Sequence, residues 1–397
     1  MLKGNKYRFY PNKKQDESLN KAFGCCRYIY NKALEYCNVN YKEIGKHIFY
    51  NELANTFLKE EKKNNEWLKE PYSQSLQQTL MHLDSAFKKF FKHETKLPAF
   101  HAKRGGQSIH YPQGVKFINN CFIIPKLGHI RAVLHRPPEG MIRSAVISKT
   151  PTGEYYISVL TEDGKEPPEK AVVAEDTTIG IDLGIKNYVA FSDGRNIENP
   201  KYLNKSIDKI KKQSKLVSRK KKGSKNRRKA SLRLAKTYRK ITRQRNDFLH
   251  KLSHRIVSEN QTIVLETLNI KGMMKNRKLA RSIGDASWAT LDTFITYKAE
   301  WQGKNVIHIP QFEPTTKVCS NCGFINDNLT LADREWICPE CGTIHSRDTN
   351  AAIVIKDVGL KMIFGSNWQP KRLRMLPAGQ VMSDRAYGAG TIVFAVK

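Results

Sequence analysis

The sequence predicts a multidomain protein of the α+β class, in which helical and strand segments are both prominent. Its 397 residues are enough for two or three domains with sizeable cores. Helical and strand patterns occupy separate stretches of the chain, and two pairs of cysteines near the C-terminus have metal-ligand spacing. The net charge of +32, from 69 basic and 37 acidic residues, predicts a nucleic acid as partner in preference to an anionic membrane.

The expected location is intracellular. No apolar run reaches the roughly 18 to 20 residues that a membrane span requires, and the N-terminal residues lack the apolar core of a secretion signal. Four of the eight cysteines lie close together and four are scattered, which favours metal binding over a disulfide framework. We therefore expect a cytoplasmic, nucleoid-associated protein with no membrane partner.

The first part of the chain predicts a small β-barrel, interrupted after its first strand by a helical module. The strand over Lys6 to Tyr10 stops at Pro11, and Asn12 can cap the helix that follows. Apolar residues then recur at helical spacing, most clearly between Ser73 and His93. Short strand patterns return beyond the module. We assign residues 1–11 and 109–175 to the barrel and residues 12–108 to the helical module.

Some basic residues of this region are candidates for phosphate contact. Arg27 lies off the apolar stripe of the first helix, where it faces either phosphate or solvent. Lys103 and Arg104 lie in a glycine-bearing loop before the β region. We include all three in the predicted nucleic-acid surface.

Two predicted strands carry an acid where a buried strand should be apolar. The strand from Thr178 contains Asp182, and the strand from Thr262 ends on Glu266. Burying a carboxylate without a partner costs roughly several kcal/mol, so these acids predict a metal site. The glycines on either side of Asp182 allow a ligand or another backbone to approach closely. The alternative is an aspartate that caps a turn at the strand end.

The most basic segment lies between these strands. Residues 201–245 contain 20 Lys or Arg and a single acid, Asp208. Apolar stripes on both sides of a break at Gly223 predict a helical hairpin over 201–256. Charge runs are often only solvated faces, but this imbalance favours phosphate contact. The candidates are Lys220, Lys221, Lys222, Lys225, Arg227 and Arg228.

The cysteine spacing is the most specific metal signal in the chain. Cys319 and Cys322 form one C-x2-C pair, and Cys338 and Cys341 form a second pair 15 residues later. This spacing predicts one structural zinc ion held by four thiolates. His345 is near enough in sequence to be considered, but four cysteines already complete a tetrahedron.

A third acid, Asp348, opens a predicted helix just after the cysteines. An acid there is ordinarily a helix cap. However, the strands of Asp182 and Glu266 can be neighbours in a mixed sheet, and this helix can pack across both. Three carboxylates so close need counter-charge. Two magnesium or manganese ions about 3.5 to 4 Å apart would supply it and would support phosphodiester hydrolysis.

At this point the chain closely resembles the TnpB family of transposon-encoded, RNA-guided DNA nucleases, which is related to compact type V CRISPR effectors. The motifs that carry the resemblance occur in order: YRFYPNKKQ, FGCCRYIYNKALEY, GIDLGIKN, SRKKKGSKNRRKA, IVLETLNIKGM, TTKVCSNCG with CPECG, and RDTNAA. The resemblance implies a RuvC-like, RNase H-type nuclease core whose catalytic acids are Asp182, Glu266 and Asp348. It also implies an inserted zinc ribbon and an N-terminal wedge-type barrel with a helical recognition insert.

The resemblance assigns segments to these parts. Residues 176–313 form the nuclease core with its basic hairpin, residues 314–345 the zinc ribbon, and residues 346–360 the last core helix. Residues 361–397 form a tail whose role is unknown.

The implied function is guided DNA cleavage. A guide RNA would pair with one strand of double-stranded target DNA, and the protein would read a short flanking motif. Ser73 and Gln77, on the polar face of one helix, are our candidates for reading that motif. The alternatives are a catalytically silent RNA-guided repressor, an unguided nuclease and a regulator of transposition.

Overall fold

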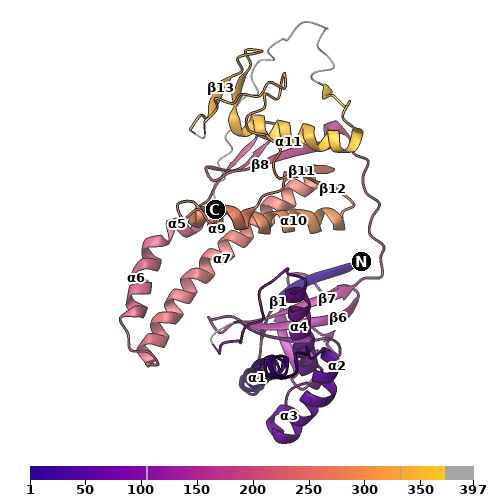
Figure 1. Ribbon diagram of the computed structural model, residues 1–397, viewed down its shortest axis with the longest axis vertical. Coiled ribbons are helices and arrows are strands. Elements are labelled where there is room, and N and C mark those ends of the chain that lie inside the picture. The colour runs from indigo at the N-terminus through magenta and orange to yellow at the C-terminus, as the bar shows by residue number, and fades with distance from the viewer. Residues whose placement is uncertain (104–105, 331, 372–397) are drawn as a thin grey trace. The chain divides into compact units, whose positions relative to one another are not determined.

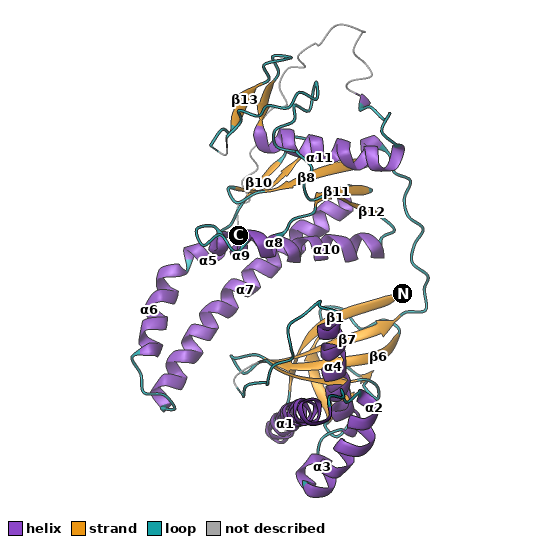
Figure 2. Ribbon diagram, in the orientation of Figure 1, coloured by secondary structure: helices purple, strands orange, loops and turns teal. Residues whose placement is uncertain are grey.

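In the computed structural model of the protein, the described residues are 1–103, 106–330 and 332–371. The chain divides into two compact units, Met1–Glu166 and a second unit that begins at Pro167. Each unit has its own sheet and its own core, and each is described by itself below (Figures 1 and 2).

The first unit is built on one seven-stranded antiparallel sheet. Its strand order is β2-β6-β7-β1-β5-β4-β3. The first strand, β1, therefore lies in the middle of the sheet although four helices separate it from β2 in the chain. The strands are β1 (Leu2–Tyr10), β2 (Gln107–Tyr111), β3 (Lys116–Ile118), β4 (Cys121–Ile124), β5 (Gly128–Val133), β6 (Met141–Lys149) and β7 (Tyr155–Glu162).

The sheet does not close, so the expectation of a barrel is wrong for the described residues. The edge strands β2 and β3 do not pair with one another. One face of the sheet is instead buried under helices, because its residues share a core with apolar side chains of α1 (Lys13–Ile44) and α4 (Ser73–Phe91). Alternating apolar residues predict a half-buried strand in either arrangement. The sequence pattern alone therefore did not distinguish an open sheet covered by helices from a barrel.

The inserted helices follow the predicted pattern. Asn12 caps α1 through a reciprocal pair of hydrogen bonds with Gln15, of 2.9 and 3.0 Å. The apolar stripe of α4 is buried, including Leu76, Leu80 and Leu83. Shorter elements join the two long helices: α2 (Tyr50–Glu52), a π-helical turn η1 (Leu53–Phe57), α3 (Leu58–Asn64) and a 3-10 turn η2 (Glu66–Lys69).

The second unit is built on a five-stranded mixed sheet of order β10-β9-β8-β11-β12. Strands β8, β9 and β10 form an antiparallel meander, and β11 lies parallel to both β8 and β12. The strands are β8 (Thr178–Leu183), β9 (Asn187–Phe191), β10 (Asn196–Glu198), β11 (Thr262–Glu266) and β12 (Asn305–Ile309). A 3-10 turn, η3 (Glu175–Thr177), precedes β8.

Helices cover both faces of this sheet (Figure 1). On one face, α7 and α10 share a core with β8, β9 and β11. On the other face, α11 packs against Val264 and Ile309 of the sheet. The helices of the unit are α5 (Tyr202–Lys205), α6 (Ile207–Ser218), α7 (Lys225–Glu259), α8 (Ile270–Met273), α9 (Ala280–Ala286), α10 (Trp288–Trp301) and α11 (Arg347–Phe364).

Two glycines let α11 approach the sheet closely. A Cβ atom added at Gly180 would lie 2.1 Å from the Ala352 carbonyl oxygen, and one at Gly359 would lie 2.5 Å from Cγ1 of Val264. Neither distance is sterically possible, so a side chain at either position would push the helix away. The glycine before Asp182 therefore accommodates another backbone, which is one of the two roles that the sequence left open.

The remaining elements are the basic hairpin and a small ribbon. The helices α6 and α7 form the basic hairpin, and Thr237 of α7 donates a 2.9 Å hydrogen bond to Gln213 of α6. Between β12 and α11, the strands β13 (Glu335–Ile337) and β14 (Ile344–Ser346) pair antiparallel. Within the described residues, no helix combines the length and the apolar character that crossing a bilayer requires.

Candidate active site and cysteine cluster

Asp182 and Glu266 lie side by side at the carboxyl edge of two parallel strands. Ile181 of β8 is paired with Leu265 of β11, so the two acids are the next residues in register. Side chains alternate between the faces of a strand. Because Gly180 and Val264 face α11, Asp182 and Glu266 face the same side of the sheet.

Asp348 reaches this corner from the first turn of α11. It lies one helical turn before Ala352, whose carbonyl oxygen contacts Gly180. The close packing of α11 on β8 thus fixes the third acid over the strand that carries Asp182. We call Asp182, Glu266 and Asp348 the carboxylate site.

The three acids are close enough to affect one another electrostatically. Burial and the charges of Glu266 and Asp348 raise the pKa of Asp182 to about 8. Burial also raises the pKa of Glu266, although a hydrogen bond from the Thr315 hydroxyl opposes that shift. At neutral pH and without a metal ion, Asp182 therefore favours its protonated form.

Several polar neighbours of the acids had no signal in the sequence pattern. Thr315, which is buried, donates a 2.7 Å hydrogen bond to Glu266. Asn187 donates a 3.2 Å hydrogen bond to Asp348. Arg334 and Arg347 each place a guanidinium nitrogen 3.6 Å from Oδ1 of Asp348. Asn187, Thr315 and Arg347 lie within quoted motifs and Arg334 does not, but for all four only the fold reveals the contact.

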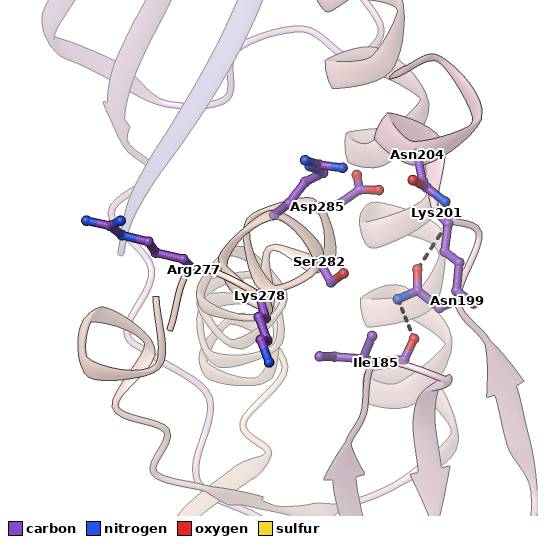
Figure 3. A pocket seen from close by; sticks show the side chains of 9 residues that line it. Ile185, Asn199, Lys201, Asn204, Arg277, Lys278, Ser282 and Asp285 are labelled. Atoms are coloured by element: carbon purple, nitrogen blue, oxygen red, sulfur yellow. Dashed lines mark hydrogen bonds between the residues drawn. The ribbon is translucent and has the colours of Figure 1, made fainter. Parts of the chain in front are cut away.

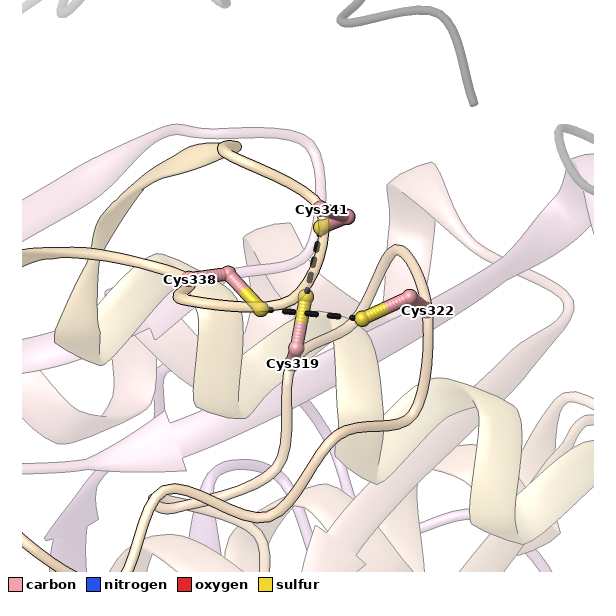
Figure 4. Close-up of side chains that lie close together, drawn as sticks. All are labelled: Cys319, Cys322, Cys338 and Cys341. Carbon is pink, nitrogen blue, oxygen red and sulfur yellow. Dashed lines mark hydrogen bonds between the residues drawn. The ribbon is translucent and has the colours of Figure 1, made fainter. Parts of the chain in front are cut away.

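The four cysteines of the two C-x2-C pairs gather at one point (Figure 4). All four sulfur atoms lie within 4.8 Å of one another. Cys319 and Cys341 are 3.7 Å apart, and Cys322 and Cys338 are 3.6 Å apart. A zinc–sulfur distance of about 2.3 Å in a tetrahedron requires sulfur atoms about 3.8 Å apart. The cysteine cluster therefore has the dimensions of a four-thiolate zinc site.

Polar neighbours prepare the cysteine cluster for a metal. Burial disfavours the thiolate of Cys341, but hydrogen bonds from Thr343 and Asn321 lower its pKa to about 6. His345 lies 3.0 Å from the sulfur of Cys319 through Nε2. It therefore sits beside a ligand sulfur, while the four cysteines supply a complete set.

The cysteine cluster and the carboxylate site are joined through the start of α11. Asn350 donates a 2.7 Å hydrogen bond to the carbonyl of Val318 and accepts one of 2.9 Å from the backbone of Ser320. Both partners flank Cys319. The first turn of α11 therefore holds Asp348 and the first cysteine loop together.

The predicted nucleic-acid residues of the first unit lie in different settings. Arg27 lines a cavity of about 120 Å³ between α1 and α4. Ser73 accepts a 2.5 Å hydrogen bond from Lys62, and Gln77 lies one turn further along α4, half-buried. Lys103 is exposed, and Arg104 lies outside the described residues.

The candidates in the basic hairpin lie around the turn between its helices. Lys221, Lys222, Lys225 and Arg228 are exposed, and Lys220 is half-buried. Arg227 differs, because its guanidinium donates a 2.8 Å hydrogen bond to the carbonyl of Lys220. That contact closes the turn, so Arg227 has a structural partner that the charge pattern did not show.

The fold and its two clusters define an α+β protein with an acidic site on a mixed sheet and a cysteine ribbon beside it. Family models match three segments: one described as a probable transposase over residues 158–277, one as a Cas12f1-like TNB domain over 288–355, and one as a helix-turn-helix domain over 1–46. In the structure, residues 1–46 form β1 and one long helix, α1, in place of two helices joined by a turn.

Whole-chain relatives identify the family. A protein of Streptomyces pristinaespiralis named "Putative RNA-guided DNA endonuclease" is 39% identical over 362 residues, 89% of each chain. "Putative RNA-guided DNA endonuclease InsQ" of Escherichia coli K12 is 29% identical, over 88% of this chain and 90% of that one. The chain belongs to the TnpB family.

A solved structure has the same fold. It is titled "Cryo-EM structure of the Cas12f1-sgRNA-target DNA complex" and aligns with a TM-score of 0.56 at 13% identity. The alignment covers 90% of this chain and 98% of that one. At this identity the likeness concerns the fold, a multidomain α+β arrangement shared along nearly the whole chain.

Proposed function

We propose that this protein is an RNA-guided DNA endonuclease that cuts its target at the carboxylate site. The observation that carries the proposal is the convergence of Asp182, Glu266 and Asp348 from two strands and a helix. The names of the relatives in Streptomyces and Escherichia coli support the same activity. All three acids are present, which a guided nuclease requires.

The carboxylate site suits divalent cations. Its donors are carboxylate oxygens, which magnesium and manganese prefer. Burial, and then the charges of Glu266 and Asp348, raise the pKa of Asp182, and the guanidinium of Arg347 opposes this only in part. Bound there, two such ions would activate a water and stabilise the attacking and leaving oxygens of a phosphodiester displacement.

The protein's own residues would prepare this chemistry. Thr315 holds Glu266 in place and Asn187 holds Asp348, so two of the carboxylates are oriented by neutral donors that do not compete with a cation for charge. Arg334 is half-exposed beside Asp348, where it can also face a phosphate. By family resemblance, one such site cuts both DNA strands in turn and leaves 5′-phosphate and 3′-hydroxyl ends.

The domain roles follow from the same proposal. The mixed sheet with α11 across it would be the RuvC-like, RNase H-type core, and the cysteine cluster would hold one structural zinc. The seven-stranded sheet with its inserted helices would be the wedge and recognition region. Ser73 and Gln77 are the candidates for reading the flanking motif, and the basic hairpin would hold the guide RNA or its heteroduplex by the phosphates.

The test begins with protein purified from cells that also transcribe its native flanking sequence. A discrete RNA should copurify, and that complex should cut a DNA library only at targets that match the RNA and adjoin one short motif. The Asp182→Ala variant should retain the RNA and bind the target without cutting it. A silent repressor would bind without cutting even as wild type. Absence of any discrete RNA, or unchanged cutting by Asp182→Ala, would overturn the proposal.

A further inference from the structure

The second unit contains a basic cavity of about 410 Å³, which we call the phosphate cavity (Figure 3). Its walls come from the turn after β8, the segment around α5 and the segment that leads into α9. The residues that line it are Ile185, Asn199, Lys201, Asn204, Arg277, Lys278, Arg281, Ser282 and Asp285.

One wall of the cavity begins just after the strand that carries Asp182. Ile185 follows Asp182 by three residues, and its carbonyl accepts a 3.0 Å hydrogen bond from Asn199. The opposite wall belongs to the segment that follows Glu266 in the chain. The strand of Asp182 is thus followed at once by one wall, and the strand of Glu266 is followed, after α8, by the other wall, which begins at Arg277.

The lining is positively charged and open to solvent. Four of its side chains are cationic, and each of them is exposed: Lys201, Arg277, Lys278 and Arg281. Within the described part of the chain, none of these four makes an ion pair with an acidic side chain. Lys201 and Lys278 approach the cavity from opposite walls (Figure 3).

The one acid in the lining is already engaged. Asp285 accepts hydrogen bonds of 3.0 and 3.2 Å from the backbone nitrogen of Leu203 and one of 3.2 Å from Arg245. These contacts tie α9 to α5 and α7, so Asp285 shapes the cavity while Arg245 balances its charge. The cavity thus keeps a net attraction for anions.

The lining chemistry points to a nucleic-acid backbone. Among the described residues that form the walls, none is aromatic, so no base-stacking platform is present. Lysine, arginine, asparagine and serine side chains are typical donors to phosphate and sugar oxygens. The volume lies within the range of small-ligand pockets, about 300 to 1,000 Å³, and is sufficient for a phosphate and its sugar.

We propose that the phosphate cavity binds a backbone phosphate of the DNA strand being cut, a few nucleotides from the scissile bond. This inference rests on the proposed nuclease function, because the strand that crosses the carboxylate site is what brings a phosphate to the cavity. The contact fixes the strand along its axis and reads no sequence.

The first test pairs a protein change with a substrate change. Lys201→Gln combined with Lys278→Gln removes one cation from each wall, and a DNA target with single uncharged methylphosphonate linkages removes one phosphate at a time. In wild type, one or two linkages near the cut should slow single-turnover cleavage about tenfold. In the double variant, which is itself about tenfold slower, the same linkages should have no further effect.

A matched control makes the same change of charge at two lysines near Lys278 in the chain. Lys271 and Lys275 are exposed and do not line the cavity. The Lys271→Gln, Lys275→Gln variant should keep the wild-type rate within about twofold and keep its sensitivity to the same linkages. If the cavity substitutions and the methylphosphonates slow cleavage independently and multiplicatively, the proposal is wrong.

A second measurement does not depend on cleavage. Binding of a fluorescent 12-nucleotide single-stranded DNA is followed by anisotropy at several salt concentrations, using the full chain as purified. The cavity variant should lower the salt dependence, log K against log salt, by about 0.7 for each phosphate that the protein no longer neutralises. An unchanged slope overturns the proposal even if wild type cuts nothing. Loss of copurified RNA in the cavity variant would assign the cavity to the guide and also overturn it.

Discussion

The carboxylate site and the cysteine cluster are neighbours, and each brings several acidic side chains together. They differ in how well those side chains tolerate one another before a metal binds. In the cysteine cluster, burial raises the pKa of Cys322 to about 11, so a thiol there can stay neutral until a metal arrives. In the carboxylate site, Asp182 is buried beside two other acids, and burial together with their charges raises its pKa to about 8. We therefore expect the cysteine cluster to hold a permanent structural ion, and the carboxylate site to bind exchangeable ions and to lower the stability of the protein when they are absent.

The largest expected effect is the loss of the structural ion. The Cys338→Ser variant should fall from about one zinc per chain to none, since a structural zinc contributes about 10 to 16 kcal/mol of apparent binding free energy in small domains. Elemental analysis of the purified protein measures this directly. The control is Cys121→Ser, which changes a cysteine outside the cysteine cluster. Equal zinc content in both variants would contradict the assignment.

The next effect tests the packing that joins the two sites. Gly180→Ala should displace α11, because its Cβ would overlap the Ala352 carbonyl oxygen. Overpacking of this kind costs about 1 to 3 kcal/mol of unfolding free energy, and misplacing Asp348 by about 1 Å should slow cleavage about 100-fold. Denaturant unfolding and single-turnover cleavage measure the two effects.

The matched control for that glycine is Gly24→Ala. Gly24 lies inside α1, and a Cβ there meets no atom within 4 Å. Alanine should therefore stabilise the protein by about 0.5 to 1 kcal/mol through helix propensity. If Gly180→Ala behaves like Gly24→Ala, α11 does not rest on β8 as described.

A pH experiment sharpens the comparison. Between about pH 4 and 8, Asp182 is ionised in the unfolded chain but keeps its proton in the folded one, so stability without magnesium should fall as pH rises and level off above about 8. Asp182→Asn removes this penalty and should stabilise the magnesium-free protein at pH 8 by about 1 to 3 kcal/mol. Thermal unfolding without a strong chelator, which would also strip zinc, measures it.

Added magnesium should stabilise wild type but not Asp182→Asn, which reverses their order of stability. Its addition at pH 8 should raise the melting temperature of wild type and leave Asp182→Asn nearly unchanged. Asp193→Asn is the control, because Asp193 pairs with Arg195 on the surface. A wild-type protein as stable as Asp182→Asn at pH 8 without magnesium would show that the acids are not in conflict.

The smallest expected effect concerns the basic hairpin. Neutralising Lys220, Lys221, Arg227 and Arg228 should weaken RNA or heteroduplex binding and flatten its salt dependence by about 0.7 to 0.9 per phosphate contact. Arg227→Lys alone separates charge from structure, since it keeps the positive charge but loses the guanidinium that closes the turn. Lys251→Gln, which removes a lysine paired with Asp247, should change little. An unchanged slope for the fourfold variant would mean that these charges form only a solvated face.

What the sequence could predict differs between the two sites for a physical reason. The cysteine spacing is local, so the short loops that bring Cys319 near Cys322 are already implied by the chain. The acids come from distant segments, and their meeting depends on the pairing of β8 with β11 and on α11 reaching Gly180. A carboxylate in an apolar strand pattern drew attention to Asp182 and Glu266, whereas Asp348 gained a role beyond a helix cap only because its helix could pack across both strands.

The rest was beyond sequence reasoning because it depends on contacts between side chains. Nothing in the pattern marks Thr315 as the partner of Glu266, or Arg334 as a neighbour of Asp348. The sequence predicted a barrel where the structure has an open seven-stranded sheet. Alternating apolar and polar residues indicate that one face of a strand is buried, but they do not indicate what covers that face. Runs of basic residues likewise predicted the basic hairpin. They did not predict the phosphate cavity, because its cationic side chains come from separate segments of the chain.

The central claim is that the carboxylate site cuts DNA chosen by a bound RNA. The direct measurement is single-turnover cleavage of a matched and a mismatched target by the purified protein–RNA complex, with wild type and Asp182→Ala side by side. Wild type with magnesium should cut only the matched target, and Asp182→Ala should bind it equally well but cut at least about 1,000-fold more slowly. Equal cleavage by both proteins, or equal cleavage of both targets, would contradict the account.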